Sequence, residues 1–254
     1  LHNIPIRSDE GKVFRTAFVP REGCAFMVAD YNQIELRCIA HLADDPGLID
    51  AFTRGIDIHS ATAARVFAVD PATVTSDMRS QAKMISYGLA YGMEAFGLSQ
   101  RLGVGVGEAS EILDAYFAAF PKEKQYMDDT IEQARTKGYT ETLFGRRRQI
   151  PELNNPNFRI RQAGERQAMN AGIQGLAADI FKIALVRIDA AIAKAKLQST
   201  VILQVHDEVI VECPVAERDK VNELVLYEMK NAASLKVPLE VNAAWGDSWA
   251  SAKA

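Results

Sequence analysis

The chain has 254 residues, enough for one large domain or two small ones, and its 48% hydrophobic and 24% charged residues are typical of a globular protein. No stretch resembles a signal peptide or a membrane span, so we expect a soluble protein with no membrane partner. The net charge of -4 does not itself indicate a nucleic-acid partner, although an acidic total can contain a basic channel.

The cysteines indicate the redox compartment of the protein, and the first residue bears on whether the chain is a piece of a longer protein. Cys24, Cys38 and Cys213 are far apart, odd in number and without metal-binding spacing, so we expect small buried residues in a reducing compartment. The chain opens on Leu1, in the middle of a pattern, so we expect a piece of a longer protein.

The N-terminal part of the sequence alternates between short apolar runs and helical periodicity. Residues 1–10 are polar and interrupted by proline, which predicts an extended segment. The apolar runs at 13–19 and 25–29 have the length of strands, and helical periodicity follows at 34–43 and 59–67.

A mainly helical region comes next. Ser76 or Asp77 is a suitable N-cap for a helix that reaches about Tyr91. Residues 108–120 and 123–137 are amphipathic and predict two further helices, with a glycine-spaced connector before them.

The remaining sequence returns to strands at its end. The expected elements are a strand at 139–143, a basic turn at 145–148, a loop at 154–157, a helix at 159–196, strands at 201–205 and 209–212, a helix at 216–229 and a strand at 238–241. Gly164, Gly172 and Gly175 are weak points of the long helix or close-packing sites. This order predicts an α+β fold with an antiparallel sheet formed by the two ends of the sequence and a helical insert between them.

Asp30 directly follows the apolar run 25–29. A carboxylate at the tip of a buried strand has a fixed position, and magnesium usually takes one or two carboxylates together with substrate phosphates. Asp30 is therefore a candidate metal ligand. The alternative is an N-cap for the next helix, which is a common reason for Asp in this place.

His206-Asp207-Glu208 connects two apolar runs. Two adjacent carboxylates repel each other unless a cation neutralises them, although a solvated acidic turn is an equally simple interpretation. Considered together with Asp30, the pattern is more specific. Two strand ends that meet in one sheet would bind two metal ions about 4 Å apart for in-line displacement at phosphorus.

A stripe of large polar side chains follows the predicted helix before Tyr91. Arg79, Lys83, Tyr87 and Tyr91 recur every four residues and so lie near one face. Two cations and two aromatic rings offer charge to phosphates and a surface for a base. The alternative is an ordinary amphipathic surface helix.

Three segments resemble motifs of the bacterial DNA polymerase I family, family A. Residues 30–37, DYNQIELR, are similar to motif A; residues 79–92, RSQAKMISYGLAYG, to motif B; and residues 204–208, QVHDE, to motif C. The resemblance covers essentially the whole chain, including the basic segment 145–148 and residues 165–174. It implies a right-hand palm, an antiparallel sheet with helices, and a helical fingers insertion, with the thumb absent.

The resemblance also implies how the chain is divided. Residues 1–60 would be the first part of the palm with motif A, residues 61–145 the fingers with motif B, and residues 146–254 the second part of the palm with motif C. The thumb would precede Leu1. Since the thumb contributes phosphate contacts, we expect this fragment to bind DNA poorly and to extend primers weakly or not at all.

The family's catalytic roles transfer to matching positions. Asp30 and Asp207 would hold two Mg²⁺ ions, or Mn²⁺ in their place, with the Tyr31 carbonyl as a further ligand. Glu208 would be a nearby, less essential carboxylate, and Lys83 would take part in catalysis.

The resemblance further implies how the substrates are bound. Glu35 would be the steric gate that excludes a ribose 2′-OH, and Tyr87, where many members carry Phe, would weaken discrimination against dideoxynucleotides. The residues that bind the dNTP would be Arg79, Lys83, His59, Tyr87, Glu35, Gln33 and Tyr31. The residues that contact primer-template DNA would be Tyr91, beside the templating position, and Arg7, Arg166, Asn170, Gln174, Gln204 and His206 along the minor groove, whose acceptors are common to all correct pairs.

The implied function is template-directed DNA synthesis in replication and repair, by a cytoplasmic, nucleoid-associated monomer that transfers dNTPs to a primer 3′-OH by two-metal chemistry. Closing of the helix 79–91 would couple correct pairing to catalysis. Two alternatives are a non-catalytic nucleic-acid-binding module and a relative of single-subunit RNA polymerases. The presence of both aspartates argues against the first, and Glu35 as a gate argues against the second. A purely structural helical protein would explain the periodicities but not the motifs.

Overall fold

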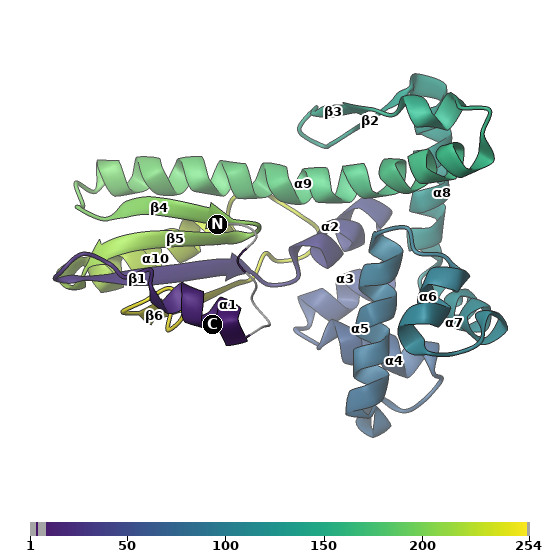
Figure 1. Cartoon of the computed structure of the whole chain (residues 1–254), viewed down its shortest axis with the longest axis horizontal. Coiled ribbons are helices and arrows are strands. Elements are labelled where there is room, and N and C mark those ends of the chain that lie inside the picture. The colour runs from purple at the N-terminus through teal and green to yellow at the C-terminus, as the bar shows by residue number, and fades with distance from the viewer. Residues whose placement is uncertain (1–3, 5–8, 253–254) are drawn as a thin grey trace. The chain divides into compact units, whose positions relative to one another are not determined.

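The computed structural model describes residue 4 and residues 9–252, and the chain forms two compact units (Figure 1). The sheet unit consists of residues 1–34, 178–234 and 239–254, and the helical unit consists of residues 35–177 and 235–238. The sheet unit thus combines the two ends of the sequence, as the predicted α+β fold requires. The boundaries proposed for palm and fingers stay a prediction.

An antiparallel sheet of order β4-β5-β1-β6 forms the centre of the sheet unit. The strands are β1 (Cys24–Tyr31), β4 (Thr200–Val205), β5 (Glu208–Pro214) and β6 (Val241–Gly246). β1 pairs with β5 on one side and β6 on the other, so its apolar run is enclosed. This confirms the predicted strand at 25–29 and the predicted antiparallel sheet.

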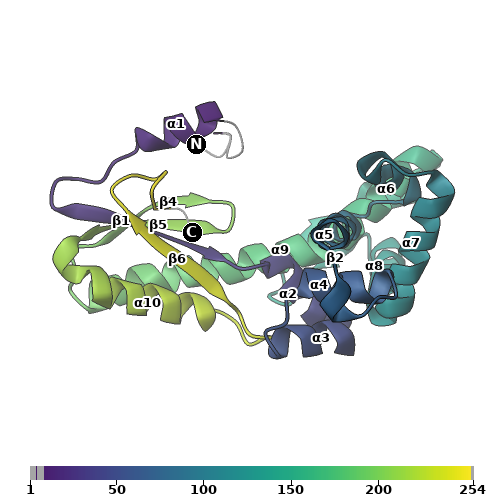
Figure 2. The same cartoon turned by 90° about the horizontal axis from the view of Figure 1, so that it is seen from below.

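Alternate residues of β1 serve the two faces of the sheet, because successive strand side chains point in opposite directions. Phe26 and Val28 belong to a core with Trp249, which Phe18 contacts edge-on with ring centroids 5.4 Å apart. On the other face the Tyr31 ring lies 6.0 Å from that of Phe181. Helices α1 (Asp9–Thr16) and α10 (Arg218–Lys230) lie on opposite sides of the sheet (Figure 2). The short helix η3 (Val215–Glu217) precedes α10.

The helical unit contains most of the helices. They are α2 (Ile34–Ala43), α3 (Pro46–Thr53), α4 (Ile58–Val66), η1 (Pro71–Thr73), α5 (Ser76–Ala90), α6 (Ala95–Leu102), α7 (Val106–Ala119), α8 (Pro121–Lys137) and η2 (Pro151–Asn154), with a small hairpin of β2 (Tyr139–Glu141) and β3 (Arg147–Gln149). Local signals explain their ends. Thr75 caps α5 in place of the predicted Ser76 or Asp77, since its hydroxyl accepts from the Met78 N–H at 3.2 Å. Gly138 ends α8 with φ 80°.

Helix α9 (Phe158–Lys194) belongs to both units, and the glycines in its sequence are close-packing sites, one of the two predicted roles. A Cβ at Gly172 would lie 2.8 Å from the Tyr126 hydroxyl, and one at Gly175 would lie 2.5 Å from a Thr142 methyl. A Cβ at Gly164 would also meet the backbone of η2. A side chain at any of these positions would therefore require its neighbours to shift. No helix in the described part of the chain is both long and apolar enough to cross a membrane.

Several predicted elements are wrong. The predicted strand at 13–19 is helical as far as Thr16, because an apolar run this short fits the period of a helix as well as that of a strand. In the predicted extended segment 1–10, Asp9 and Glu10 are also helical. The rest of that segment, except Ile4, lies outside the described residues. The last strand starts at Val241 instead of Pro238. Helices α3 and α6 were not predicted, and strand β3 occupies part of the expected basic turn.

Candidate active site

The sheet brings the two predicted metal-binding aspartates together. Asp30, at the end of β1, is the register partner of Glu208, the first residue of β5. One residue further, the Tyr31 N–H donates to the Asp207 carbonyl at 3.4 Å. Motifs A and C, far apart in sequence, therefore meet at one end of the sheet, as the sequence predicted.

Asp207 lies in a tight hairpin. Val205 pairs with Glu208, so only His206 and Asp207 connect β4 to β5. His206 has φ 54°, a left-handed conformation in which His is more frequent than most non-glycine residues. The Gln204 side-chain amide donates to the His206 carbonyl at 2.7 Å. Gln204 and His206, predicted to contact DNA, thus also shape the turn that carries Asp207.

Asp30 and Glu208 form a like-charged cross-strand pair. Directly opposed residues of an antiparallel pair share one face, and like charges there are destabilising unless a cation lies nearby. Glu208 is 8% exposed, and its Oε1 accepts from the Trp249 indole N–H at 2.8 Å. The indole therefore holds one oxygen of Glu208. Sequence reasoning missed Trp249, because nothing local links it to the acidic turn.

Tyr31 contributes its side chain to structure. The side chain is 2% exposed and its hydroxyl donates to the Met229 carbonyl at 2.8 Å. Only its backbone carbonyl is thus suited to the predicted metal contact. Gln33, next along the chain, has φ 55° in the turn that leads into α2.

The donors in the sheet unit fit magnesium. Among residue 4 and residues 9–252, no three His, Cys, Asp or Glu side chains converge to form a metal cluster. The predicted ligands amount to two carboxylates and one carbonyl, all hard oxygen donors. Magnesium characteristically binds through one or two carboxylates and completes its shell with water and substrate phosphates. The residues present therefore suit a metal that arrives with its substrate.

Helix α5 presents the predicted stripe to solvent. Arg79 and Lys83 are exposed and Tyr87 is partly exposed, whereas Ile85 and Leu89 are buried on the opposite side. Tyr91 follows the helix as its C-cap and is 42% exposed. The four positions are thus accessible along one side of the helical unit.

Arg79 is held by Asp57. Its Nε and Nη2 donate to the two carboxylate oxygens at 2.7 and 3.1 Å. Burial tends to raise the pKa of Asp57, but hydrogen bonds from Arg79 and Ser60 outweigh it and lower this pKa to about 2. Asp57 therefore stays charged at neutral pH, in the place where an anionic substrate would meet Arg79.

His59 lies deeper than the prediction implies. Its side chain is 2% exposed, and its ring centroid is 5.8 Å from that of Tyr87. Burial lowers the pKa of His59 to about 4, with further lowering by Arg79 and Lys83 against the opposite effect of Asp57. The imidazole is therefore neutral at pH 7. Its predicted contact with a triphosphate stays a prediction.

Glu35 and Tyr91 are joined directly. The Tyr91 hydroxyl donates to Glu35 Oε2 at 2.7 Å. The predicted gate in motif A and the predicted stacking residue at the end of motif B thus position each other. Neither sequence motif by itself indicates this contact.

The predicted minor-groove residues of α9 lie one turn apart on one face. Arg166, Asn170 and Gln174 all belong to the helical unit. Arg166 packs over Gly92, where a Cβ would lie 2.9 Å from its Cγ, and its Nη1 is 3.6 Å from Glu94 Oε1. Arg7, the remaining predicted contact, lies outside the described residues.

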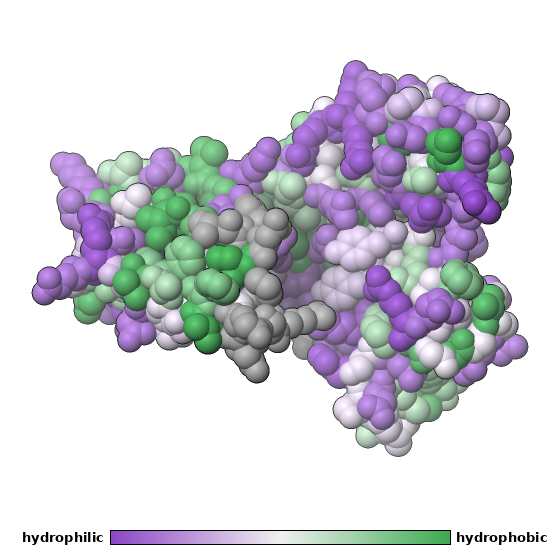
Figure 3. All heavy atoms as spheres, in the orientation of Figure 1, coloured by the Kyte–Doolittle hydropathy of each residue, from purple (hydrophilic) through white to green (hydrophobic). Residues whose placement is uncertain are grey.

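The basic segment 145–148 has a structural role. Arg146 donates to the Gly175 carbonyl at 2.6 Å, and Arg148 donates to the Gln167 side chain at 3.1 Å. Arg147 pairs with Glu141. The bonds of Arg146 and Arg148 hold the β2–β3 hairpin against α9, in a region whose visible surface is mainly hydrophilic (Figure 3).

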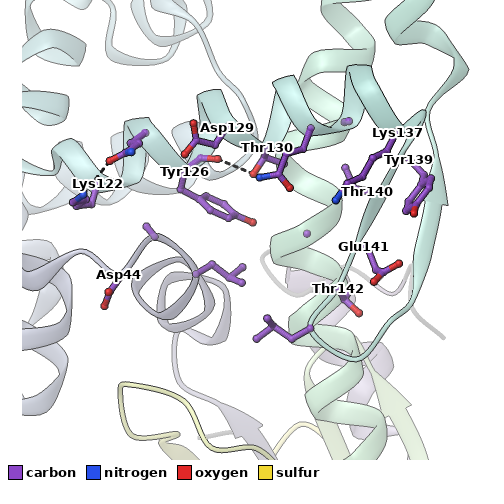
Figure 4. Close-up of a pocket in the computed structure, with 17 residues that line it drawn as sticks. Asp44, Lys122, Tyr126, Asp129, Thr130, Lys137, Tyr139, Thr140, Glu141 and Thr142 are labelled. Carbon is purple, nitrogen blue, oxygen red and sulfur yellow. Dashed lines mark hydrogen bonds between the residues drawn. The ribbon is translucent and has the colours of Figure 1, made fainter.

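Two hollows lie within the helical unit. A groove of about 520 Å³ follows α8, with Asp44, Tyr126, Asp129 and Glu141 among its lining (Figure 4). None of the predicted site residues lines this groove. Its lining carries both acidic and basic side chains. A second hollow of about 320 Å³, mostly apolar, is lined by Leu89, Gly92, Arg166 and other residues, and so adjoins the end of α5.

The fold and the three motifs together define a nucleic-acid polymerase domain, and sequence comparison identifies the family. Residues 1–251 match the model of DNA polymerase family A, so the chain belongs to this family. This confirms the resemblance inferred from the motifs.

Individual relatives agree. The chain is 50% identical over 250 residues to DNA polymerase I of Mycobacterium tuberculosis (strain ATCC 25618 / H37Rv), which covers 98% of this chain and 28% of that protein. It is 46% identical over 254 residues to DNA polymerase I of Geobacillus stearothermophilus, covering 100% of this chain and 29% of the relative. The chain thus spans less than a third of the length of these relatives.

A solved structure extends the similarity to three dimensions. The polymerase domain of Pol1 from M. smegmatis, in complex with DNA primer-template and dNTP, superimposes with a TM-score of 0.95 at 48% identity. The match covers 99% of this chain and 45% of that chain. The α+β fold expected from the sequence is therefore that of a family A polymerase domain.

Proposed function

We propose that this chain is the catalytic part of a DNA-directed DNA polymerase that adds dNTPs to a primer 3′-OH under the direction of a template. The observation that carries the proposal is the register of β1 and β5, which pairs Asp30 with Glu208 and joins Tyr31 to Asp207. Membership of the family and the substrates named for the M. smegmatis structure support it.

The sheet unit would bind the metal. Asp30, Asp207 and the Tyr31 carbonyl are the groups that would hold Mg²⁺, or Mn²⁺ in its place. When bound, two such ions would activate the primer hydroxyl and neutralise the charge that develops on the phosphates. The Trp249 indole would keep Glu208 in the vicinity of Asp30 without leaving it fully available as a ligand.

The helical unit would bind the incoming nucleotide. Arg79 and Lys83 are exposed cations on α5, suited to triphosphate oxygens. The bond from Arg79 to Asp57 would be exchanged for one to phosphate when the nucleotide binds. Lys83 would place its ammonium against the charge of the departing pyrophosphate. His59 would take part as a neutral donor beside Tyr87.

Sugar selection would depend on Glu35. The hydrogen bond from Tyr91 fixes its carboxylate, and a fixed carboxylate excludes a 2′-OH more strictly than a mobile one. Tyr87 would offer its hydroxyl where a dideoxynucleotide lacks the 3′-OH. The proposed substrate is therefore a deoxyribonucleoside triphosphate.

Primer-template DNA would contact α9 and the β4–β5 turn. Arg166, Asn170, Gln174 and Gln204 offer donors that suit the acceptors shared by all base pairs in the minor groove. Tyr91 would stack near the templating base. We further propose palm and fingers with the boundaries given above, a monomer, and action on the bacterial nucleoid.

Primer extension tests the proposal. The chain, joined to a family A thumb that supplies the phosphate contacts, is incubated with a labelled primer-template, Mg²⁺ and either dNTPs or rNTPs. The expected result is template-dependent extension with dNTPs, abolished in Asp207→Asn and retained in Asp219→Asn, an exposed aspartate of the same unit. Binding of DNA without any extension would favour the non-catalytic module, and equal use of rNTPs would favour the RNA polymerase relative.

A further inference from the structure

The interior of the helical unit contains a buried acid that none of the proposed roles uses. Glu123 on α8 is 0% exposed, and Tyr116 on α7 and Asp45, which caps α3, are each 1% exposed. The Tyr116 hydroxyl donates to Glu123 Oε2 at 2.8 Å. This bond joins α7 to α8 in the interior of the helical unit.

The two carboxyl groups each leave one oxygen without a partner. In the described part of the chain, Glu123 Oε1 and Asp45 Oδ2 are buried and accept no hydrogen bond. Asp45 Oδ1 accepts from the N–H groups of Gly47 and Leu48 at 2.9 and 3.2 Å. These two bonds make Asp45 the N-cap of α3, so its Oδ1 already has a structural role, whereas Glu123 has none beyond its bond to Tyr116.

No basic side chain in the described part of the chain forms an ion pair with Glu123 or Asp45. Arg65 of α4 is exposed, and its guanidinium lies over the Phe120 ring at 5.3 Å. Lys122 and Lys124, the neighbours of Glu123 on α8, are also exposed. Within the described residues neither buried carboxyl has an ion pair, and an unpaired buried charge is strongly unfavourable.

We propose that Glu123 is a proton-binding site, which holds one proton on its buried carboxyl group and so makes the stability of the helical unit fall as pH rises from acidic to neutral. The proton removes the charge from a carboxyl group that is 0% exposed and has one oxygen without a hydrogen-bond partner. Burial raises the pKa of Glu123 to about 8; the hydrogen bond from Tyr116 lowers it and the charge of Asp45 raises it.

The pH dependence has a definite sign. The ordinary pKa of 4.5 applies in the unfolded chain, so the pKa is higher in the folded state. Folding then takes up a proton between the two values, and the stability contributed by this group is lost as pH rises toward about 8. Above that pH both states are ionised and the dependence ends.

Unfolding of the wild type and Glu123→Gln at a series of pH values tests the proposal. The amide has the shape of the acid and no titration. The ratio of the two unfolding equilibrium constants, wild type over variant, should rise about tenfold per pH unit between about pH 5 and 8 and then level off. Glu111→Gln, an exposed glutamate of α7, is the matched control and should give a constant ratio.

Two outcomes would overturn the proposal. One is a ratio for Glu123→Gln that is constant over this range, or that levels off near pH 5. The other comes from the wild type alone, and so holds even if the variant does not fold: carbon NMR of labelled glutamate side chains in which every carboxyl titrates near pH 4 to 5. With Asp45→Asn the Glu123 midpoint should move down; an unchanged midpoint would contradict the role of Asp45.

Discussion

The two units position their charged residues by different means. In the sheet unit, backbone pairing sets the places of Asp30 and Asp207, through the register of β1 with β5 and a two-residue hairpin. In the helical unit, the helix fixes only the direction of the α5 stripe, and side-chain bonds such as Arg79 to Asp57 set the positions of the charged ends.

This difference matches what each part of the proposed reaction needs. Metal ligands must stay within a fraction of an ångström of one arrangement, which a sheet supplies through many backbone hydrogen bonds at once. Groups that capture and release a nucleotide must change partners, and exposed ion pairs exchange at little cost. Side-chain substitutions can distinguish the fixed metal ligands of the sheet unit from the exchangeable nucleotide-binding groups of the helical unit.

The largest effect is expected at the sheet. Asp30→Asn and Asp207→Asn should each lower kcat of primer extension by roughly 10³-fold or more, since bound metal supplies several kcal/mol of transition-state stabilisation and each 1.36 kcal/mol is tenfold. The double variant should be no slower than either single one, because the two residues act as a unit. Single-turnover extension measures this, and substantial activity in either variant would refute the metal assignment.

Although Asp30→Asn should lower activity, it should raise the stability of the chain in the absence of metal. Asp30→Asn removes the like charge opposite Glu208, so the free energy of unfolding without metal should rise by up to about 1 kcal/mol. Denaturant unfolding in EDTA checks this expectation. A clear loss of stability would mean that Asp30 is held by favourable contacts and not opposed by Glu208.

In the helical unit we expect a substitution to cause a smaller loss of activity, because it weakens binding of the substrate. Lys83→Ala should lower kcat/KM for dNTP by roughly 10- to 100-fold, because a charged hydrogen bond contributes about 1.5–3 kcal/mol. The melting temperature should stay the same, since Lys83 is exposed. Lys124→Ala, an exposed lysine of α8, is the control for general loss of positive charge. A drop in melting temperature matching the loss in rate would contradict the proposed role.

The next prediction tests a single group of the α5 stripe, the hydroxyl of Tyr87. Tyr87→Phe should raise discrimination against dideoxynucleotides by about two- to tenfold, as loss of one neutral hydrogen bond costs about 0.5–1.5 kcal/mol. Competition between ddNTP and dNTP measures the ratio. Equal discrimination by both proteins would show that the hydroxyl does not stand in for the missing 3′-OH.

The smallest effect is expected for the exchangeable ion pair. Asp57 has a lower pKa folded than unfolded, so its stabilisation is present above its ordinary pKa of 3.8 and lost as pH falls toward about 2. Because the side chain is 37% exposed, Asp57→Asn should cost less than about 1 kcal/mol at pH 7 and nothing below pH 2. The released Arg79 should bind dNTP more tightly, with a KM lowered a few-fold; a raised KM would show that Asp57 is needed to orient Arg79.

Much of the fold could be predicted from local patterns. The strand at 25–29, the helix before Tyr91 and the long helix that became α9 all have periodicity that spans their whole length. Short segments were less certain: a run of a few apolar residues fits either a helix or a strand, so 13–19 was wrong, and the last strand was displaced by a few residues.

The sequence by itself determined the family, the motifs and the chemical types in the candidate site, because residue identity and spacing along the chain suffice for those. Only the tertiary structure decided which groups meet. The bonds from Trp249 to Glu208 and from Tyr91 to Glu35, the neutral burial of His59 and the pairing of Tyr116 with Glu123 all join residues from different elements. Burial and hydrogen bonding depend on the whole packed chain, and no local pattern encodes them.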